Sequence, residues 1–228
     1  TQRSTLFPYT TLFRSHLREA FGEGSPTPLA LATVLQAEQK GTADAVRCAL
    51  PALPATDTWV LIVYGDVPGL TAATLRSLLA ARCEGGIVFL SMHVDEPTGY
   101  GRVVRDAEGR VQRIVEHKDC SPEELLVGEV NSGIYCVQAS FLRAHLAAVR
   151  DENRARELYL TDLVEIAARD GRAAAIRVDD AAELAGVNDR IQLAQAEAYL
   201  RHRTNRELML SGVSLCDPAS CTIEPTVM

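Results

Sequence analysis

The fold prediction starts from residues 59–68, which read Trp-Val-Leu-Ile-Val-Tyr-Gly-Asp-Val-Pro. The run from Trp59 to Val63 is apolar and rich in β-branched side chains, which predicts a strand buried on both faces, as in parallel sheets. Gly65 ends the run, and Asp66 follows at the carboxyl end of the strand. Ligands bind at that edge in open α/β sheets, although an aspartate there also serves as a turn former or helix cap. The stretch therefore predicts a buried strand. It leaves two roles for Asp66 equally open, that of a ligand-binding residue and that of a turn former or helix cap.

Helical and strand patterns alternate on both sides of this stretch. A helix is predicted over Ala43–Leu50 with Thr42 as its N-cap, and another over residues 72–82 with Thr71 as its N-cap. A second buried strand follows at Ile87–Met92. This alternation is typical of a right-handed, mostly parallel α/β sheet.

The second half of the chain predicts a hairpin, two further strands and three helices. The hairpin strands are Gly101–Arg105 and Arg110–His117, and the later elements are strand Asn131–Val137, helix 140–149, helix Leu160–Arg169, strand Ala173–Val178 and a helix of roughly 20 residues from Asp189 to Leu210. The last helix has small, sparse apolar residues and is stopped by Gly212. It fits an arm that leads away from the domain.

Composition narrows the class of protein. The chain has 228 residues with ordinary apolar and charged fractions, and its net charge of −7 argues against sequence-independent binding of nucleic acid. No apolar run is long enough to span a bilayer and no signal peptide is evident. The six cysteines form no C-x-x-C pair, which favours reduced thiols in a cytoplasmic protein over disulfides or a metal site.

The two ends of the chain stand apart from this pattern. Residues 1–15 have neither helical nor strand period and resemble the translation of a sequencing adapter, so we expect them to be a disordered artefact. Residues 16–21 could be the tail of a helix. At the other end, Thr226-Val227-Met228 stops in the middle of what looks like a new element.

Polar residues gather in five loops where predicted strands or helices begin and end. Each has an ordinary structural explanation: a capped helix after Gln36…Gly41-Thr42, a turn at 97–102, a solvated charge cluster at 115–119, a strand start at 129–133 and an N-cap at 186–190. Each also suits a ligand. An amide can read a base edge, paired glycines let a backbone approach a ligand, and a carboxylate can bind a sugar hydroxyl.

Taken in order, these motifs resemble one family. They are GT at 41–42, YGDVP at 64–68, PTGYGRVV at 97–104, IVEHKD at 114–119, EVNSGIY at 129–135, LYLTD at 158–162 and GVNDRIQLAQAE at 186–197. The family is the uridylyltransferase (pyrophosphorylase) domain of the bifunctional bacterial enzyme that makes UDP-N-acetylglucosamine for cell-wall synthesis. The resemblance covers about residues 29–218.

The resemblance implies an α/β fold of the Rossmann-like nucleotidyltransferase type. It has a mostly parallel mixed sheet, a small β-hairpin insertion and a long C-terminal arm helix. Residues 16–188 would be a truncated nucleotidyltransferase domain, 189–212 the arm helix, and 213–228 the start of a truncated left-handed β-helix domain. The family is trimeric through that second domain, so we expect a monomer for this piece.

The resemblance also assigns roles to single residues. The substrates are UTP and N-acetylglucosamine-1-phosphate and the cofactor is Mg²⁺, with no nucleic-acid or membrane partner. Carried over position by position, the uracil contacts are Gln36, Gly41 and Thr42; the nucleotide-sugar site includes Tyr64 and Gly65; the Mg²⁺ ligands and catalytic residues are Asp66 and Asn188; the N-acetylglucosamine contacts are Gly101, Glu116 and Asn131; and Tyr159 and Thr161 lie near the sugar phosphate.

The sequence departs from the family in one respect. Members begin with a Gly-rich loop of the type LAAGxGTRM followed by a lysine, which holds the triphosphate, and no such motif occurs here. We therefore expect the chain as printed to have little or no activity. Other readings stay open: another sugar-1-phosphate nucleotidyltransferase, or a non-catalytic nucleotide-sugar binding module. A metal-dependent glycosyltransferase is a third, although it usually has D-x-D where this chain has Gly65-Asp66-Val67.

Overall fold

The computed structural model describes residues 33–223. The predictions for residues 1–15 and for a helix over 16–21 lie outside this range. The strands are β1 (Trp59–Ile62), β2 (Ile87–His93), β3 (Arg102–Arg105), β4 (Val111–Val115), β5 (Glu129–Gln138) and β6 (Ala173–Val178). The α-helices are α2 (Thr42–Ala49), α3 (Ala72–Ala80), α4 (Ala139–His145), α5 (Asp162–Arg169) and α6 (Arg190–Leu210). The described elements therefore match the predicted ones in type and order.

One mixed sheet organises the domain, as the sequence predicts, although most of its neighbouring strands pair antiparallel rather than parallel. Its strand order is β4-β3-β5-β2-β6, and β1 pairs with the same strand β5. The pairings show that β1, β2, β3 and β6 run in one direction, while β4 and β5 run in the other. The central strand β5 therefore lies antiparallel between β1 and β2, and only β2 and β6 are parallel neighbours.

The prediction that β1 is buried on both faces is wrong. All four of its residues are only partly buried. The strand pairs with β5 along one edge, and no strand within residues 33–223 pairs with its other edge. A β-branched apolar run therefore indicated a strand correctly but not its depth in the sheet.

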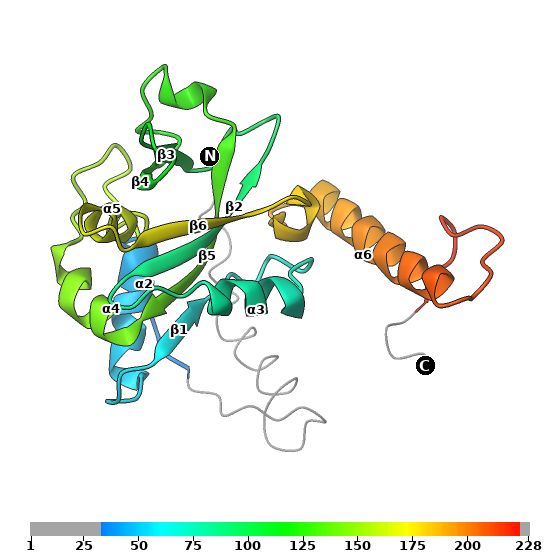
Figure 1. Cartoon of the computed structure of the whole chain (residues 1–228), viewed down its shortest axis with the longest axis horizontal. Coiled ribbons are helices and arrows are strands. Elements are labelled where there is room, and N and C mark those ends of the chain that lie inside the picture. The colour runs from blue at the N-terminus through cyan, green and yellow to red at the C-terminus, as the bar shows by residue number, and fades with distance from the viewer. Residues whose placement is uncertain (1–32, 224–228) are drawn as a thin grey trace.

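Two apolar cores cover the two faces of the sheet. Successive residues of β2 alternate between them, because neighbouring side chains in a strand point to opposite faces. Ile87 and Phe89 pack with residues of α2, α4 and α5, whereas Val88 and Leu90 pack with residues of α3. Figure 1 shows α3 on one side of the sheet and α2, α4 and α5 on the other. Because apolar cores cover both faces of the sheet, a ligand site is expected at the edge where the strands end.

The N-termini of α3 and α2 show whether the predicted N-cap residues are correct. The hydroxyl of Thr71 accepts a hydrogen bond from the backbone N–H of Thr74 and caps α3, as expected. The prediction that Thr42 caps α2 is wrong: Gly41 is the N-cap residue and makes no side-chain bond. The hydroxyl of Thr42 instead accepts from the backbone N–H of Leu160, 3.0 Å away. A tertiary contact thus replaces the local one.

The long helix α6 points away from the sheet (Figure 1). It has 21 residues, among which only Asn205 is buried. Its attachment to the domain is polar: the hydroxyl of Tyr199 donates to Asp180 at 2.9 Å, and Arg203 donates to the carbonyl oxygen of Gly69 at 2.6 Å. Asp189 caps its first turn by accepting from the N–H of Gln192, which decides between the two residues, Asn188 and Asp189, that the sequence offers as the N-cap.

Candidate active site

Asp66 and Asn188 both lie beside Gly186. A Cβ atom at this glycine would lie 3.9 Å from Oδ2 of Asp66 and 3.8 Å from Nδ2 of Asn188. The two loops are joined by a hydrogen bond from the N–H of Val187 to the carbonyl oxygen of Asp66, 2.8 Å long. The structure therefore brings together two exposed polar side chains that are more than a hundred residues apart in the chain.

Tyr64, two residues before Asp66, rests on the backbone of Gly133. A Cβ at Gly133 would come within 1.9 Å of the Tyr64 ring, and the residue has φ +83°. Only glycine tolerates both the contact and this backbone conformation. Because β5 is antiparallel to β1, its amino end lies beside the carboxyl end of β1, which explains why these two loops meet. Gly65 connects Tyr64 to Asp66.

Asn131 lies near the start of β5 and is held by its neighbours. Its Oδ1 accepts from the N–H of Gly133 at 3.1 Å, and its Nδ2 donates to the hydroxyl of Tyr135 at 2.7 Å. Its backbone N–H donates to the carbonyl oxygen of Gly101 at 2.8 Å. Asn131 and Gly101, both predicted site residues, are therefore in direct contact.

Glu116 follows β4 and completes this group. Both of its carboxylate oxygens lie 3.5 Å from where a Cβ of Gly101 would be. The buried hydroxyl of Thr161 donates to Oε1 of Glu116 at 3.2 Å. Four predicted residues, three from separate loops and one from β5, therefore form one connected group: Gly101, Glu116, Thr161 and Asn131.

Gly41 and Thr42 are bound to the segment that carries Tyr159 and Thr161. The N–H of Ala43 donates to the carbonyl oxygen of Leu158 at 2.9 Å, and the N–H of Leu158 donates to the carbonyl oxygen of Lys40 at 2.6 Å. A Cβ at Gly41 would lie 2.4 Å from that Leu158 oxygen. A side chain at Gly41 would force these two backbones apart.

Gln36 is constrained more than the sequence suggests. Its Nε2 donates to the carbonyl oxygen of Gly41 at 3.2 Å and to Oδ2 of Asp44 at 2.8 Å. Both amide hydrogens are thus used within the protein, which leaves only Oε1 for a ligand. The bond from Gln36 is the main reason why the pKa of Asp44 lies below its ordinary value.

The surroundings of Thr161 raise the pKa values of two residues near it in the chain, Tyr159 and Asp162. Burial, together with the charges of Asp119 and Glu116, holds the pKa of Tyr159 well above its ordinary value. Burial, with the charges of Glu165 and Glu116, raises the pKa of Asp162 to about 6. The site therefore concentrates negative charge near Glu116, where a neutral sugar hydroxyl is a better partner than a free anion.

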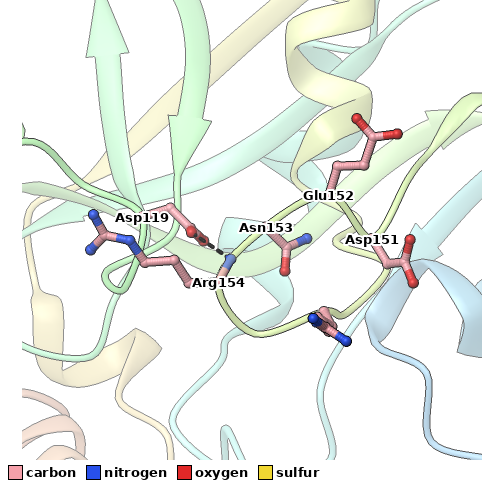
Figure 2. Close-up of a pocket in the computed structure, with 6 residues that line it drawn as sticks. Asp119, Asp151, Glu152, Asn153 and Arg154 are labelled. Carbon is pink, nitrogen blue, oxygen red and sulfur yellow. Dashed lines mark hydrogen bonds between the residues drawn. The ribbon is translucent and has the colours of Figure 1, made fainter.

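An open cleft of about 610 Å³ lies next to this site and is shown in Figure 2. Its lining includes the loop from Asp151 to Arg154, and Oδ1 of Asp119 accepts from the N–H of Arg154 at 2.9 Å. None of the predicted site residues lines it. The cleft adjoins the candidate site through Asp119, whose charge acts on Tyr159.

Three residues of the site were not singled out by the sequence. Gly186 lies beside both Asp66 and Asn188, Gly133 supports Tyr64, and Tyr135 binds Asn131. The two glycines stand inside quoted motifs, so their motifs could have suggested them. Tyr135 also stands inside a quoted motif, EVNSGIY at 129–135, but an aromatic residue within an apolar strand looks the same as a core residue.

The residues around Gly186 suit a magnesium ion. Mg²⁺ prefers oxygen ligands and binds few protein groups, usually one or two carboxylates with several waters. Asp66 offers a carboxylate, and Asn188 offers an amide oxygen once its amide, whose nitrogen faces Gly186, turns over. The donor set therefore fits.

Comparison with known proteins gives the chain a family. The family described as nucleotidyl transferase matches residues 8–182. The chain is 52% identical over 196 residues to the "Bifunctional protein GlmU" of Trichlorobacter lovleyi, which covers 85% of this chain and 43% of that protein. It is 50% identical over 216 residues to the protein of the same name from Pelobacter propionicus, with 93% and 47% covered.

A protein of the same name from Corynebacterium efficiens is 46% identical over 196 residues, which cover 85% of this chain and 40% of that protein. The chain thus spans less than half the length of these curated relatives. Within residues 33–223, no helix has the length and apolar character needed to cross a membrane. Both the mixed α/β sheet and the family match lead to one conclusion: the chain belongs to the nucleotidyl transferase family.

Proposed function

We propose that this site forms UDP-N-acetylglucosamine and pyrophosphate from UTP and N-acetylglucosamine-1-phosphate. The observation that carries the proposal is the meeting of Asp66 and Asn188 at Gly186, beside the group formed by Gly101, Glu116 and Asn131. A metal position next to a hydroxyl-binding position is what a sugar nucleotidyltransferase needs. The relatives of this chain that are named bifunctional protein GlmU support the same pair of substrates.

The proposed division of the site follows the contacts. Oε1 of Gln36 would accept from the uracil N–H, with Gly41 and Thr42 holding the loop against Leu158 and Leu160. Tyr64 and Gly65 would line the nucleotide-sugar position. Gly101, Glu116 and Asn131 would contact the N-acetylglucosamine, and Tyr159 and Thr161 would lie near its phosphate.

The proposed reaction requires the protein mainly to position the two substrates. The attacking phosphate oxygen of the sugar phosphate is already ionised, so no general base is needed. The reacting phosphates repel one another, and catalysis depends on in-line alignment and charge neutralisation. Mg²⁺ supplies that charge when bound, held by Asp66 and Asn188. We place the reaction in the cytoplasm, where UTP is made, and expect a homotrimer for the full-length protein and a monomer for this piece.

The test is equilibrium binding of UDP-N-acetylglucosamine by calorimetry, with and without Mg²⁺. We expect Mg²⁺ to tighten binding to the wild-type chain, and Asp66→Asn to abolish that gain because it removes the only carboxylate of the proposed pair. Asp170→Asn is the matched control, since Asp170 is exposed at the far end of α5. Pyrophosphate release by the chain as printed should stay far below that of an intact relative.

Two results would contradict the proposal. One is an Mg²⁺-dependent gain in affinity that is the same in Asp66→Asn as in the wild type. The other is equal affinity for UDP-N-acetylglucosamine and for nucleotide sugars with another base, which would point to a different nucleotidyltransferase.

A further inference from the structure

Arg102 is a buried cation whose two hydrogen-bond partners are a carbonyl oxygen and an imidazole. It is the first residue of β3 and is 1% exposed. Its Nη1 donates to the carbonyl oxygen of Tyr100, and its Nη2 lies 3.2 Å from Nδ1 of His117. Its Nε is buried without a hydrogen-bond partner among residues 33–223. Burying a charge is costly unless it is paired with an opposite charge, so we expect Arg102 to have a role other than stability.

The bond to Arg102 determines the state of the His117 ring. A guanidinium nitrogen can only donate, so Nδ1 of His117 must accept. The ring is therefore neutral and carries its proton on Nε2. An asparagine in place of His117 could offer a similar acceptor, because its Oδ1 stands at about the same distance from the backbone as Nδ1.

Arg102 also stands where the pairing between β3 and β4 ends. It pairs with the last residue of β4, and Gly101 and Glu116 are the next residues beyond this pair. The carboxylate of Glu116 lies over Gly101, with both oxygens 3.5 Å from where a Cβ of that glycine would be. The Arg102 guanidinium spans the same gap, because its partners Tyr100 and His117 lie one residue further along each turn.

We infer that Arg102 is a positioning residue: through its bond to His117 it holds the turn that carries Glu116 against Gly101 and so places the carboxylate for the sugar. This inference rests on the proposed function, because it requires a sugar at this position. Thr161 restrains the carboxylate from the α5 side, and Arg102 restrains the turn from the β3 side. Arg102 itself is too buried to touch a ligand, so its effect on binding is confined to the sugar.

The experiment measures binding of UDP-N-acetylglucosamine and of UDP, which lacks the sugar, by calorimetry. Arg102→Met and His117→Leu each remove one side of the bond and leave an apolar side chain in its place. We expect each variant to bind UDP-N-acetylglucosamine about tenfold more weakly and UDP as the wild type does. The double variant should lose no more than either single variant, because both changes remove the same bond.

Two further variants separate positioning from a general loss of structure. His117→Asn should keep the wild-type affinity for both ligands, since it retains an acceptor for Arg102. Arg113→Met is the matched control, because Arg113 lies in the same hairpin and donates to Glu124 at 2.8 Å on the protein surface. It should change neither affinity.

Several results would overturn the inference. An equal loss of affinity for both ligands in Arg102→Met would show a merely structural role. The inference would also fall if neither single variant lost affinity, if the losses multiplied in the double variant, or if His117→Asn lost as much as His117→Leu. If the wild type bound UDP-N-acetylglucosamine no more tightly than UDP, the proposed sugar position itself would fall, and the inference with it.

A second measurement needs no variant that must fold. In nitrogen-15 spectra of the wild-type chain above neutral pH, Nδ1 of His117 should be unprotonated and Nε2 should carry the proton. A proton on Nδ1 would leave Arg102 without its acceptor and would overturn the inference.

Discussion

Gly41 lies where the uracil-side loop meets the segment before α5, and its replacement by alanine tests how closely these backbones approach. The residue has φ 116° and ψ 179°, a conformation that is essentially restricted to glycine. A Cβ there would lie 2.4 Å from the carbonyl oxygen of Leu158. Because that atom belongs to the backbone, it cannot move without disturbing the bonds that Leu158 makes with Ala43 and Lys40.

The magnitude follows from these two effects. The backbone conformation costs a non-glycine residue roughly 1–3 kcal/mol. Losing one of the two flanking hydrogen bonds costs about 1 kcal/mol more. We therefore expect Gly41→Ala to lower the free energy of unfolding by about 3 kcal/mol, which corresponds to a fall in Tm of roughly 6–12 °C for a domain of this size.

Gly109→Ala is the control for this prediction. Gly109 has φ +80° in the β3–β4 turn, and a Cβ there would have no atom within 4 Å. It should lose only the conformational part, about 1 kcal/mol. Urea unfolding followed by the fluorescence of the single tryptophan, Trp59, measures both variants. If Gly41→Ala were no less stable than Gly109→Ala, the close approach to Leu158 would not be the reason for glycine at this position.

Two further predictions concern titration and capping. The pKa of Asp162 is raised to about 6, chiefly by burial, so the folded state holds its proton more tightly than the unfolded state, and the stability this group contributes is lost as pH rises through 6. Asp162→Asn should therefore gain stability relative to wild type at pH 7.5 compared with pH 4.5 in urea titrations, and a difference independent of pH would refute the assignment. Thr71→Ala should cost about 1 kcal/mol by removing the cap of α3, whereas Ser77→Ala on the exposed face of that helix should be nearly neutral; equal effects would contradict the cap.

Local patterns were sufficient to locate most elements. Strand β6 was predicted at its observed bounds and α3 with its capping residue, because apolar period and cap chemistry depend only on nearby residues. For α6 the prediction left the cap open between Asn188 and Asp189, and the structure shows Asp189. The burial of β1 and the role of Thr42 as the N-cap of α2 were predicted wrongly for one shared reason. Both depend on partners far along the chain, β5 for the strand and Leu160 for the hydroxyl.

The candidate site divides in the same way. The sequence by itself determined the chemical groups of the site and the loops that carry them, since side-chain chemistry and glycine positions are properties of the residues. Only the tertiary structure decided that Asp66 meets Asn188 at Gly186 and that Tyr64 rests on Gly133. The physical reason is that Tyr64 meets Gly133 through the antiparallel placement of β5 beside β1, and Asp66 meets Asn188 through the hydrogen bond from Val187 to the carbonyl oxygen of Asp66. Both contacts join segments whose separation in the chain carries no local signal.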